Sequence, residues 1–318
     1  MNWSETWPWV AFLALVLGLL VLDLGVLHRR GHVVRPKEAL GWSLFWISLA
    51  MVFCGVIYVW KGPGPAVEFL TGYLIEQSLS VDNLFVFVLI FTYFRVPPEY
   101  QHRVLFWGIL GAIVFRATFI LAGAWLLSRF SWIEYIFGAF LLFTALKMLK
   151  GGEPEIHPEG NRLVRVFRRF IPVTADFDGT KFFVERGGIL TATPLVIVLI
   201  LVETTDIVFA LDSIPAIFGV TRDPFIVFTS NIFAVLGLRA LYFLLASVLG
   251  LFAFLNVGLA GVLAFVGLKM LLSHWVHIAT STSLLIVFGL LSLSILASIL
   301  FGPKKPPEDT PGDAPANG

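Results

Sequence analysis

The stretch from Glu203 to Pro215, ETTDIVFALDSIP, places three carboxylates inside an apolar run that extends from Ile189 to Val220. About 20 apolar residues span the hydrocarbon core of a bilayer, so this run is long enough to cross a membrane. A carboxylate at that depth costs on the order of 2.5 kcal/mol or more unless it is paired or hydrated. Glu203, Asp206 and Asp212 are therefore candidate functional residues, and they predict a site inside the membrane.

The composition of the whole chain indicates the same class of protein. Of the 318 residues, 58% are hydrophobic and 14% are charged, and the mean hydropathy is +0.89. Soluble domains carry about 25% charged residues, so the chain is predicted to be an all-α polytopic membrane protein in contact with the lipid bilayer. The net charge of +1 gives no reason to expect a nucleic-acid partner. The single cysteine, Cys54, excludes an intramolecular disulfide and a thiolate metal cluster.

The apolar segments predict nine membrane spans, with boundaries that are approximate. They lie at about 7–27, 40–60, 66–94, 103–127, 131–150, 189–218, 224–249, 254–273 and 278–301. The N-terminus, MNWSETWPW, has no positively charged region before the first apolar segment. It is therefore interpreted as an aromatic anchor to a retained first helix rather than as a signal peptide.

The distribution of basic residues between alternate loops predicts the orientation. Loops 28–39, 95–102, 151–188 and 250–253 and the tail fall on one side, which together with the adjoining span ends holds 15 Lys and Arg residues, against three on the other side. Because basic loops stay in the cytoplasm, we expect the N-terminus outside and the C-terminus in the cytoplasm.

Two pairs of basic residues within the spans indicate an internal repeat. Phe115-Arg116-Ala117 recurs as Leu238-Arg239-Ala240, and the segment at 143–149 (FTALKML) recurs at 265–271 (FVGLKML). Each copy would contain three helices, and an odd number of spans forces the second copy to enter the membrane from the opposite side. This is the inverted-repeat arrangement of many secondary transporters.

These features divide the chain into six predicted parts. They are two N-terminal membrane helices (1–65), a first three-helix repeat (66–150), a basic cytoplasmic loop (151–188), a second three-helix repeat (189–273), a last membrane helix (274–301) and a disordered cytoplasmic tail (302–318). Within the loop, residues 162–170 (RLVRVFRRF) predict a basic amphipathic helix, which has either a membrane-surface role or a purely topogenic one.

The acidic spans are predicted to be discontinuous. At 100° per residue, Glu76 and Asp82 stand about 120° apart on an ideal helix, and Asp212 points away from Glu203, so unbroken helices cannot direct all the acids to one place. Pro215 removes an amide donor, and the pairs Asp82-Asn83 and Asp212-Ser213 favour local bonds to the backbone. Both helices are therefore expected to unwind or kink in mid-membrane.

The side chains of these two spans are hard oxygen ligands, which suit Mg²⁺, Ca²⁺ or Mn²⁺ rather than Zn²⁺ or copper. Since like charges in a low dielectric oppose one another, protons could replace the ion as it leaves, and protons or another counter-ion are expected partners. No catalytic residue and no tightly bound cofactor are predicted, and the chain is not expected to be an enzyme. The predicted metal ligands are Glu76, Asp82, Asn83, Glu203, Asp206, Asp212 and Ser213.

Arg116 and Arg239 allow two interpretations. Each could neutralise a buried carboxylate as part of the structure, or it could act as a gating counter-charge that replaces the metal in one state. Lys147 and Lys269, near the ends of their spans, are expected to extend to the membrane surface and receive no role in the site.

The motifs EQSLSVDN at 76–83, ETTDIVFALDSIPA at 203–216, TSN at 229–231 and LRA at 238–240 resemble those of the TerC family of bacterial membrane proteins, and within it the Alx-type branch. The resemblance covers about residues 40 to 300. It implies export of manganese from the cytoplasm, an alkaline or metal-stress setting, and for some relatives a role in membrane-protein secretion or envelope assembly. It also implies that Glu76, Asp82, Glu203, Asp206 and Asp212 are the acidic motif positions.

The sequence thus predicts a secondary transporter that exports Mn²⁺ through a carboxylate site at the bilayer midplane, with Mg²⁺ or Ca²⁺ as other possible ions. Two alternatives stay open. One is an assembly or stress-response scaffold whose acids hold a structural metal or pair with arginine. The other is an exporter of a small organic cation, which would need aromatic side chains around the acids.

Overall fold

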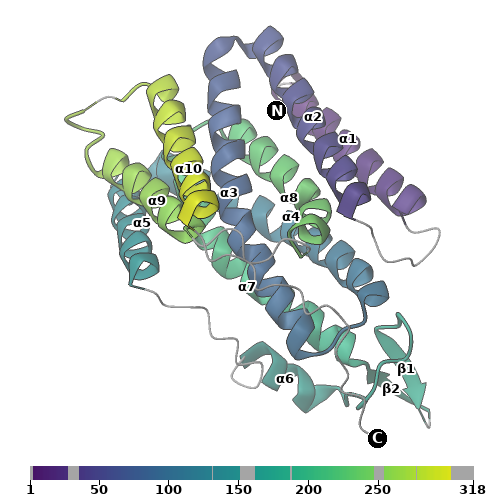
Figure 1. The fold of residues 1–318 in the computed structure, drawn as a ribbon. Helices are drawn as coiled ribbons and strands as arrows, with labels where there is room; N and C mark the ends of the chain where they lie inside the picture. The colour runs from purple at the N-terminus through teal and green to yellow at the C-terminus, as the bar shows by residue number, and fades with distance from the viewer. Residues whose placement is uncertain are drawn as a thin grey trace, which may run out of the picture.

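The computed structural model describes residues 3–27, 36–130, 132–150, 162–186, 188–246, 254–276 and 278–301. The predicted tail at 302–318 and the first part of the predicted loop, 151–161, lie outside the described residues. The described chain is almost entirely helical (Figure 1). Its elements are α1 (Trp3–Leu27), α2 (Pro36–Lys61), α3 (Pro63–Tyr93), α4 (Pro98–Arg129), α5 (Ile133–Leu149), α6 (Arg162–Phe170), β1 (Phe183–Arg186), β2 (Ile189–Ala192), α7 (Pro194–Phe218), α8 (Pro224–Ala246), α9 (Leu255–Leu271) and α10 (Thr280–Phe301).

Five stretches of helix in the described residues are long and apolar enough to cross a membrane. They are Lys37–Lys61, Pro98–Arg129, Pro194–Phe218, Pro224–Leu244 and Thr280–Phe301. The prediction of a helical, multi-pass membrane protein is confirmed. A helix also occupies each of the nine predicted stretches, but that all nine cross the membrane stays a prediction.

The helices α3 and α7 are continuous, so the prediction that both are broken is wrong. Backbone helix runs through Asp82-Asn83 in α3 and through Asp212-Ser213 in α7. Pro215 lies inside α7 but three residues before its end at Phe218, so the hydrogen bond that it removes is near the end of the helix and not in mid-membrane.

Three hydroxyl groups on these two helices bond to the backbone of their own helix. Ser78, Thr204 and Thr205 each donate a hydrogen bond to the carbonyl oxygen four residues earlier, at 2.6, 2.6 and 2.9 Å. Because these bonds are made within regular helix, these three hydroxyl groups are satisfied without unwinding the backbone.

The sixth predicted span begins later than expected, because residues 189–192 form strand β2. This strand pairs antiparallel with β1, with Phe183 opposite Ala192 and Arg186 opposite Ile189. Pro194 disfavours helix at the residue before it, and Thr193 is accordingly extended, with a hydroxyl that donates to the Lys181 carbonyl oxygen at 2.7 Å. The helix therefore begins at Pro194.

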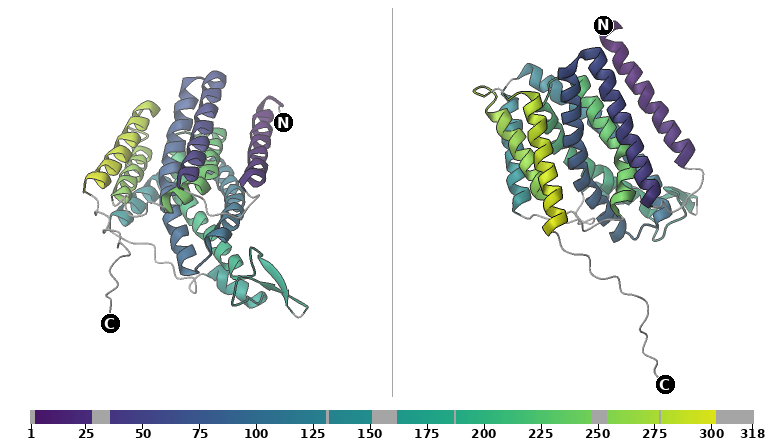
Figure 2. Two further views of the ribbon diagram at one scale, coloured as in Figure 1. Left: turned by 45° about the vertical axis from the view of Figure 1, so that its right-hand side comes forward. Right: turned by 45° about the horizontal axis from the view of Figure 1, so that its top comes forward.

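The central helices pack in a reciprocal pattern (Figures 1 and 2). Helix α3 lies against α8 and α7, α4 lies against α7 and α8, and α5 lies against α9. On the two flanks, α2 packs on α8 and α3, and α10 packs on α9 and α3. Small residues allow the closest approach, since a side chain on Gly267 of α9 would come within 2.7 Å of the Gly138 carbonyl oxygen of α5.

Helix α6 and the hairpin β1–β2 lie together at one end of the bundle (Figure 2). The predicted amphipathic helix at 162–170 is confirmed as a helix, and its buried Val164 belongs to the same apolar cluster as Leu195 of α7. Arg103 of α4 holds the adjoining loop through a 2.9 Å hydrogen bond to Thr180 and through contact with the ring of Phe182.

Candidate functional site

Arg116 lies near the middle of α4 with a side chain that is completely buried. Its Nε and Nη2 donate to the two carboxylate oxygens of Asp206, on α7, at 3.1 and 2.9 Å. Its Nη1 donates to Glu76, on α3. One guanidinium is therefore held between carboxylates from the two acidic helices, in the bidentate geometry that favours Arg over Lys.

Asn231 on α8 completes this cluster. Its side-chain oxygen accepts a 3.1 Å hydrogen bond from Arg116, and its amide nitrogen donates to the second oxygen of Glu76 at 3.0 Å. Four helices thus contribute one polar side chain each to a fully enclosed network. With both carboxylates ionised, the network carries one positive and two negative charges, and its net charge is −1.

Local packing determines the depth of these groups. The α3 residue Gly72 lies against Ile217 of α7, and the two helices run in opposite directions. Glu76, four residues after Gly72, and Asp206, eleven residues before Ile217, both reach the guanidinium of Arg116. One acid from each of the two motif helices therefore meets the same arginine.

The other predicted acids have separate neighbours. Asp212 accepts a 3.1 Å hydrogen bond from the Thr144 hydroxyl of α5. Glu203 lies directly against Gly111 of α4, where a methyl group in place of the glycine hydrogen would overlap its carboxylate. The side chain of Asp82 lies outside the described residues. Arg239 is 4% exposed and lines a small cavity together with Asp206.

A comparison with known families agrees with these motifs. The model of the Integral membrane protein TerC family matches residues 61–305, which include α3 to α10 and every side chain of the buried network. The chain belongs to the TerC family. No solved structure matches it.

Curated relatives extend the similarity of this TerC-family chain over nearly its full length. It is 54% identical to the "Uncharacterized membrane protein STKORF319" of Myxococcus xanthus, over 98% of this chain and 99% of that protein. It is 50% identical to the "Putative membrane-bound redox modulator Alx" of Escherichia coli K12, over 91% of this chain and 92% of that protein. A membrane protein of Rickettsia bellii is 43% identical over 92% of this chain.

Several buried oxygen atoms in the TerC motifs have no hydrogen-bond partner among the described residues. They belong to Gln77, Ser80 and Asn83 on α3 and to Glu203 and Ser213 on α7. Buried polar atoms in native proteins are almost always satisfied, by water or an ion where no protein group is available. All five are hard ligands of the kind that divalent cations prefer.

The acids do not form one compact cluster in this conformation. Within the described residues, no three Asp, Glu, His or Cys side chains are grouped closely enough to hold a metal ion. Glu76 and Asp206 are brought together by Arg116, whereas Glu203 and Asp212 lie elsewhere on α7. Arg116 therefore pairs with two buried acids in this conformation, and this pairing is common to both interpretations of its role.

Two residues of the site were not selected from the sequence. Asn231 appears only in the family motif at 229–231, and the signal that it belongs to the site is its position as a polar group in a strongly apolar helix. Thr144 lies in the repeated segment at 143–149, but it is uncharged and so does not stand out in the sequence. Only the packing of α5 on α7 identifies it as a neighbour of Asp212.

Proposed function

We propose that this TerC-family protein is a secondary transporter that exports a divalent metal ion from the cytoplasm through the site around Arg116. The main proposed substrate is Mn²⁺. The observation that carries the proposal is a buried arginine held between Glu76 and Asp206 at the centre of the bundle. In a cation transporter, an arginine between two acids would occupy the place of the transported ion while the pathway is closed. The choice of manganese rests on the family resemblance.

The charges of the network favour a divalent substrate. Arg116 leaves a net charge of −1 when both acids are ionised, whereas a dication in its place would bring the charge to zero. We therefore assign Arg116 the role of a counter-charge, which pairs with Glu76 and Asp206 when no metal is bound and withdraws when it binds. The unpartnered oxygens on α3 and α7 would complete the coordination together with water.

The inverted repeat is part of the same proposal. Glu76 and Asp206 each precede an aspartate by six residues, Asp82 and Asp212. If the two motifs are equivalent, α3, α4 and α5 of the first repeat correspond to α7, α8 and α9 of the second. The contact of α3 with α8 then corresponds to the contact of α7 with α4, and both contacts occur. Such an exchange would let one half of the protein rock against the other around a fixed site.

Export needs an energy source. Moving a dication outward against a potential of 100 mV costs about 4.6 kcal/mol, since each charge costs about 2.3 kcal/mol. We infer that inward movement of protons or another counter-ion supplies this energy. The proposed setting is a bacterial inner membrane with the N-terminus outside and the C-terminus in the cytoplasm.

Transport in proteoliposomes tests the proposal. We expect vesicles that contain the full-length protein to move Mn²⁺ and an imposed pH gradient to change the rate. We expect Asp206→Asn and Glu76→Gln each to reduce the rate at least tenfold, because each removes one of the two charges that would hold the ion. Glu99→Gln, at the start of α4 and away from the network, is the matched control and should transport normally.

The same arginine–acid network also favours the scaffold alternative, in which the acids are purely structural. Mn²⁺ flux through the wild-type protein distinguishes the two functions, since a scaffold would give no flux above that of empty vesicles. Normal flux in Asp206→Asn would mean that the protein is a transporter but that the site around Arg116 does not carry the ion. Flux that ignores the pH gradient would exclude protons as the counter-ion.

A further inference from the structure

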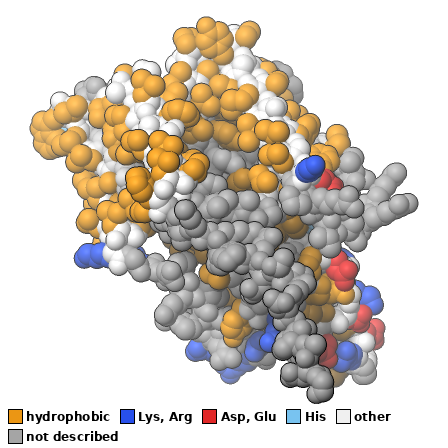
Figure 3. Space-filling view, in the orientation of Figure 1, with side chains coloured by type: hydrophobic (Ala, Val, Ile, Leu, Met, Phe, Trp, Pro, Cys, Tyr) orange, Lys and Arg blue, Asp and Glu red, His pale blue; other side chains and the backbone are white. Residues whose placement is uncertain are grey.

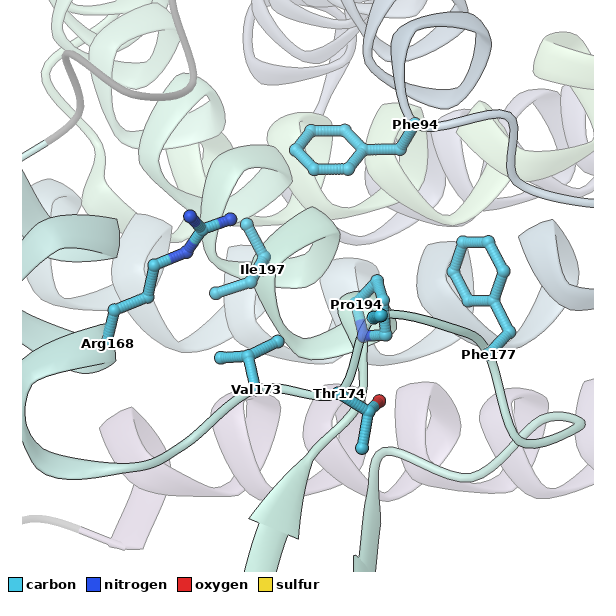
Figure 4. A pocket seen from close by; sticks show the side chains of 8 residues that line it. Phe94, Arg168, Val173, Thr174, Phe177, Pro194 and Ile197 are labelled. Carbon is cyan, nitrogen blue, oxygen red and sulfur yellow. The ribbon is translucent and has the colours of Figure 1, made fainter.

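A second feature lies away from the buried network. A cavity of about 480 Å³ opens between α6, the segment that follows it and the adjoining ends of α3 and α7 (Figure 4). Cavities of about 300–1,000 Å³ are typical of small-molecule sites. The proposed transport pathway does not use this cavity.

Six of the eight side chains that line the cavity are apolar, and the polar ones are Arg168 and Thr174. Phe94, Phe177 and Ile197 are among the apolar side chains, and Arg168 of α6 extends its guanidinium above Ile197 (Figure 4). Within the described part of the chain, no carboxylate is paired with Arg168. The hydroxyl of Thr174 donates to the Asp176 carbonyl oxygen at 2.8 Å and is already used. The cavity therefore offers one cation beside an apolar wall, which fits an amphiphilic anion.

The location of the cavity narrows the choice of anion. Pro194 and Ile197 lie in the first turn of α7, a helix of membrane-spanning length, and Phe94 directly follows the end of α3. The cavity thus sits where membrane helices meet the extramembrane segment. The neighbouring α6 exposes the apolar side chains of Leu163, Val166 and Phe170 among arginines, as do helices that lie in the headgroup region.

We propose that this cavity binds one molecule of an anionic phospholipid, with its phosphate on Arg168 and the upper part of an acyl chain against Phe94 and Ile197. A soluble phosphate compound fits less well, because recognition of a free phosphate uses several donors, whereas Arg168 is the one charged group among the residues that line the cavity. Bound lipid would fasten α6 to the start of α7, the helix that carries Asp206.

Native mass spectrometry of the delipidated full-length protein tests this proposal. We expect the wild type to retain added phosphatidylglycerol in preference to phosphatidylcholine, and Arg168→Gln to weaken that retention about tenfold. Arg169→Gln is the matched control, since Arg169 is the neighbouring exposed arginine with the same charge but does not line the cavity.

Three outcomes would overturn the assignment. Equal losses in Arg168→Gln and Arg169→Gln would mean that lipid binds to the general positive charge of α6. Equal retention of the two lipids by the wild type would show that the site does not select a lipid with a net negative charge. Displacement of phosphatidylglycerol by millimolar inorganic phosphate would identify the cavity as a site for soluble anions.

Discussion

Arg116 supplies the positive charge that balances the buried carboxylates at the centre of the bundle. It is fully buried and is the partner of both Glu76 and Asp206. We expect Arg116→Met to reduce the free energy of unfolding by about 3–5 kcal/mol, because it leaves two buried carboxylates without a counter-charge. Thermal unfolding in detergent measures the change.

The control for this prediction is Arg222→Met. Arg222 also forms an ion pair, with Glu134, but its side chain is 60% exposed, and exposed pairs contribute about 0–1 kcal/mol. Adding Glu76→Gln and Asp206→Asn to Arg116→Met should recover stability, since the uncompensated charges are then gone. Equal losses in the two arginine variants would show that burial of the charges is not the cause.

At the level of single residues, the sequence marks Glu76, Arg116 and Asp206 as candidates but does not show which of the charged groups pair. Arg116, Glu76 and Asp206 were all selected because charge in an apolar run is costly. Glu203 and Asp206 are three residues apart on one helix, and both lie toward α4. Which of them reaches Arg116 depends on the relative position of α4 and α7, and this is set by packing at glycines such as Gly111, which no charge pattern reveals.

At the level of elements, hydrophobic runs predicted the helices well because the need to satisfy backbone groups in lipid leaves few other structures. The predicted breaks in α3 and α7 rested on the assumption that all the acids converge. They do not converge, since Asp212 contacts Thr144 of α5 while Asp206 contacts Arg116 of α4. Neighbouring helices bring partners to Glu76, Asp206 and Asp212, so these acids do not require either helix to unwind.

The crossing of α5 and α9 provides a test at the same scale. A methyl group at Gly267 would come within 2.7 Å of the Gly138 carbonyl oxygen, so the two helices would have to separate. We expect Gly267→Ala to cost about 1–3 kcal/mol of unfolding free energy, as overpacking does. Gly289→Ala in α10 is the control, because it meets nothing within 4 Å and gains helix propensity. Equal stability of the two variants in detergent would show that the helices do not meet closely at Gly267.

At the scale of the whole molecule, the two ends differ in charge. At the end opposite α6, Lys61 is paired with Asp223 at 2.6 Å and Arg222 with Glu134. Charged side chains gather at the end with α6 and the hairpin, whereas hydrophobic ones cover much of the visible bundle (Figure 3). Apolar periodicity gave no sign of the hairpin, because the short strand β2 (Ile189–Ala192) is as apolar as the helix that follows it.

This asymmetry leads to a prediction about the membrane that also tests α5. Ser128, at the end of α4, and Lys181, before the hairpin, are exposed and are separated by α5, which at 17 residues is about 25 Å long and only just spans a bilayer. In a Cys54→Ser background, we expect an impermeant maleimide to label Ser128→Cys in spheroplasts and Lys181→Cys only after lysis, because basic segments stay in the cytoplasm. The reverse pattern would contradict the orientation. Labelling of both from one side would mean that α5 does not cross the membrane, and three helices per repeat, on which the inverted arrangement of the acidic motifs depends, would no longer hold.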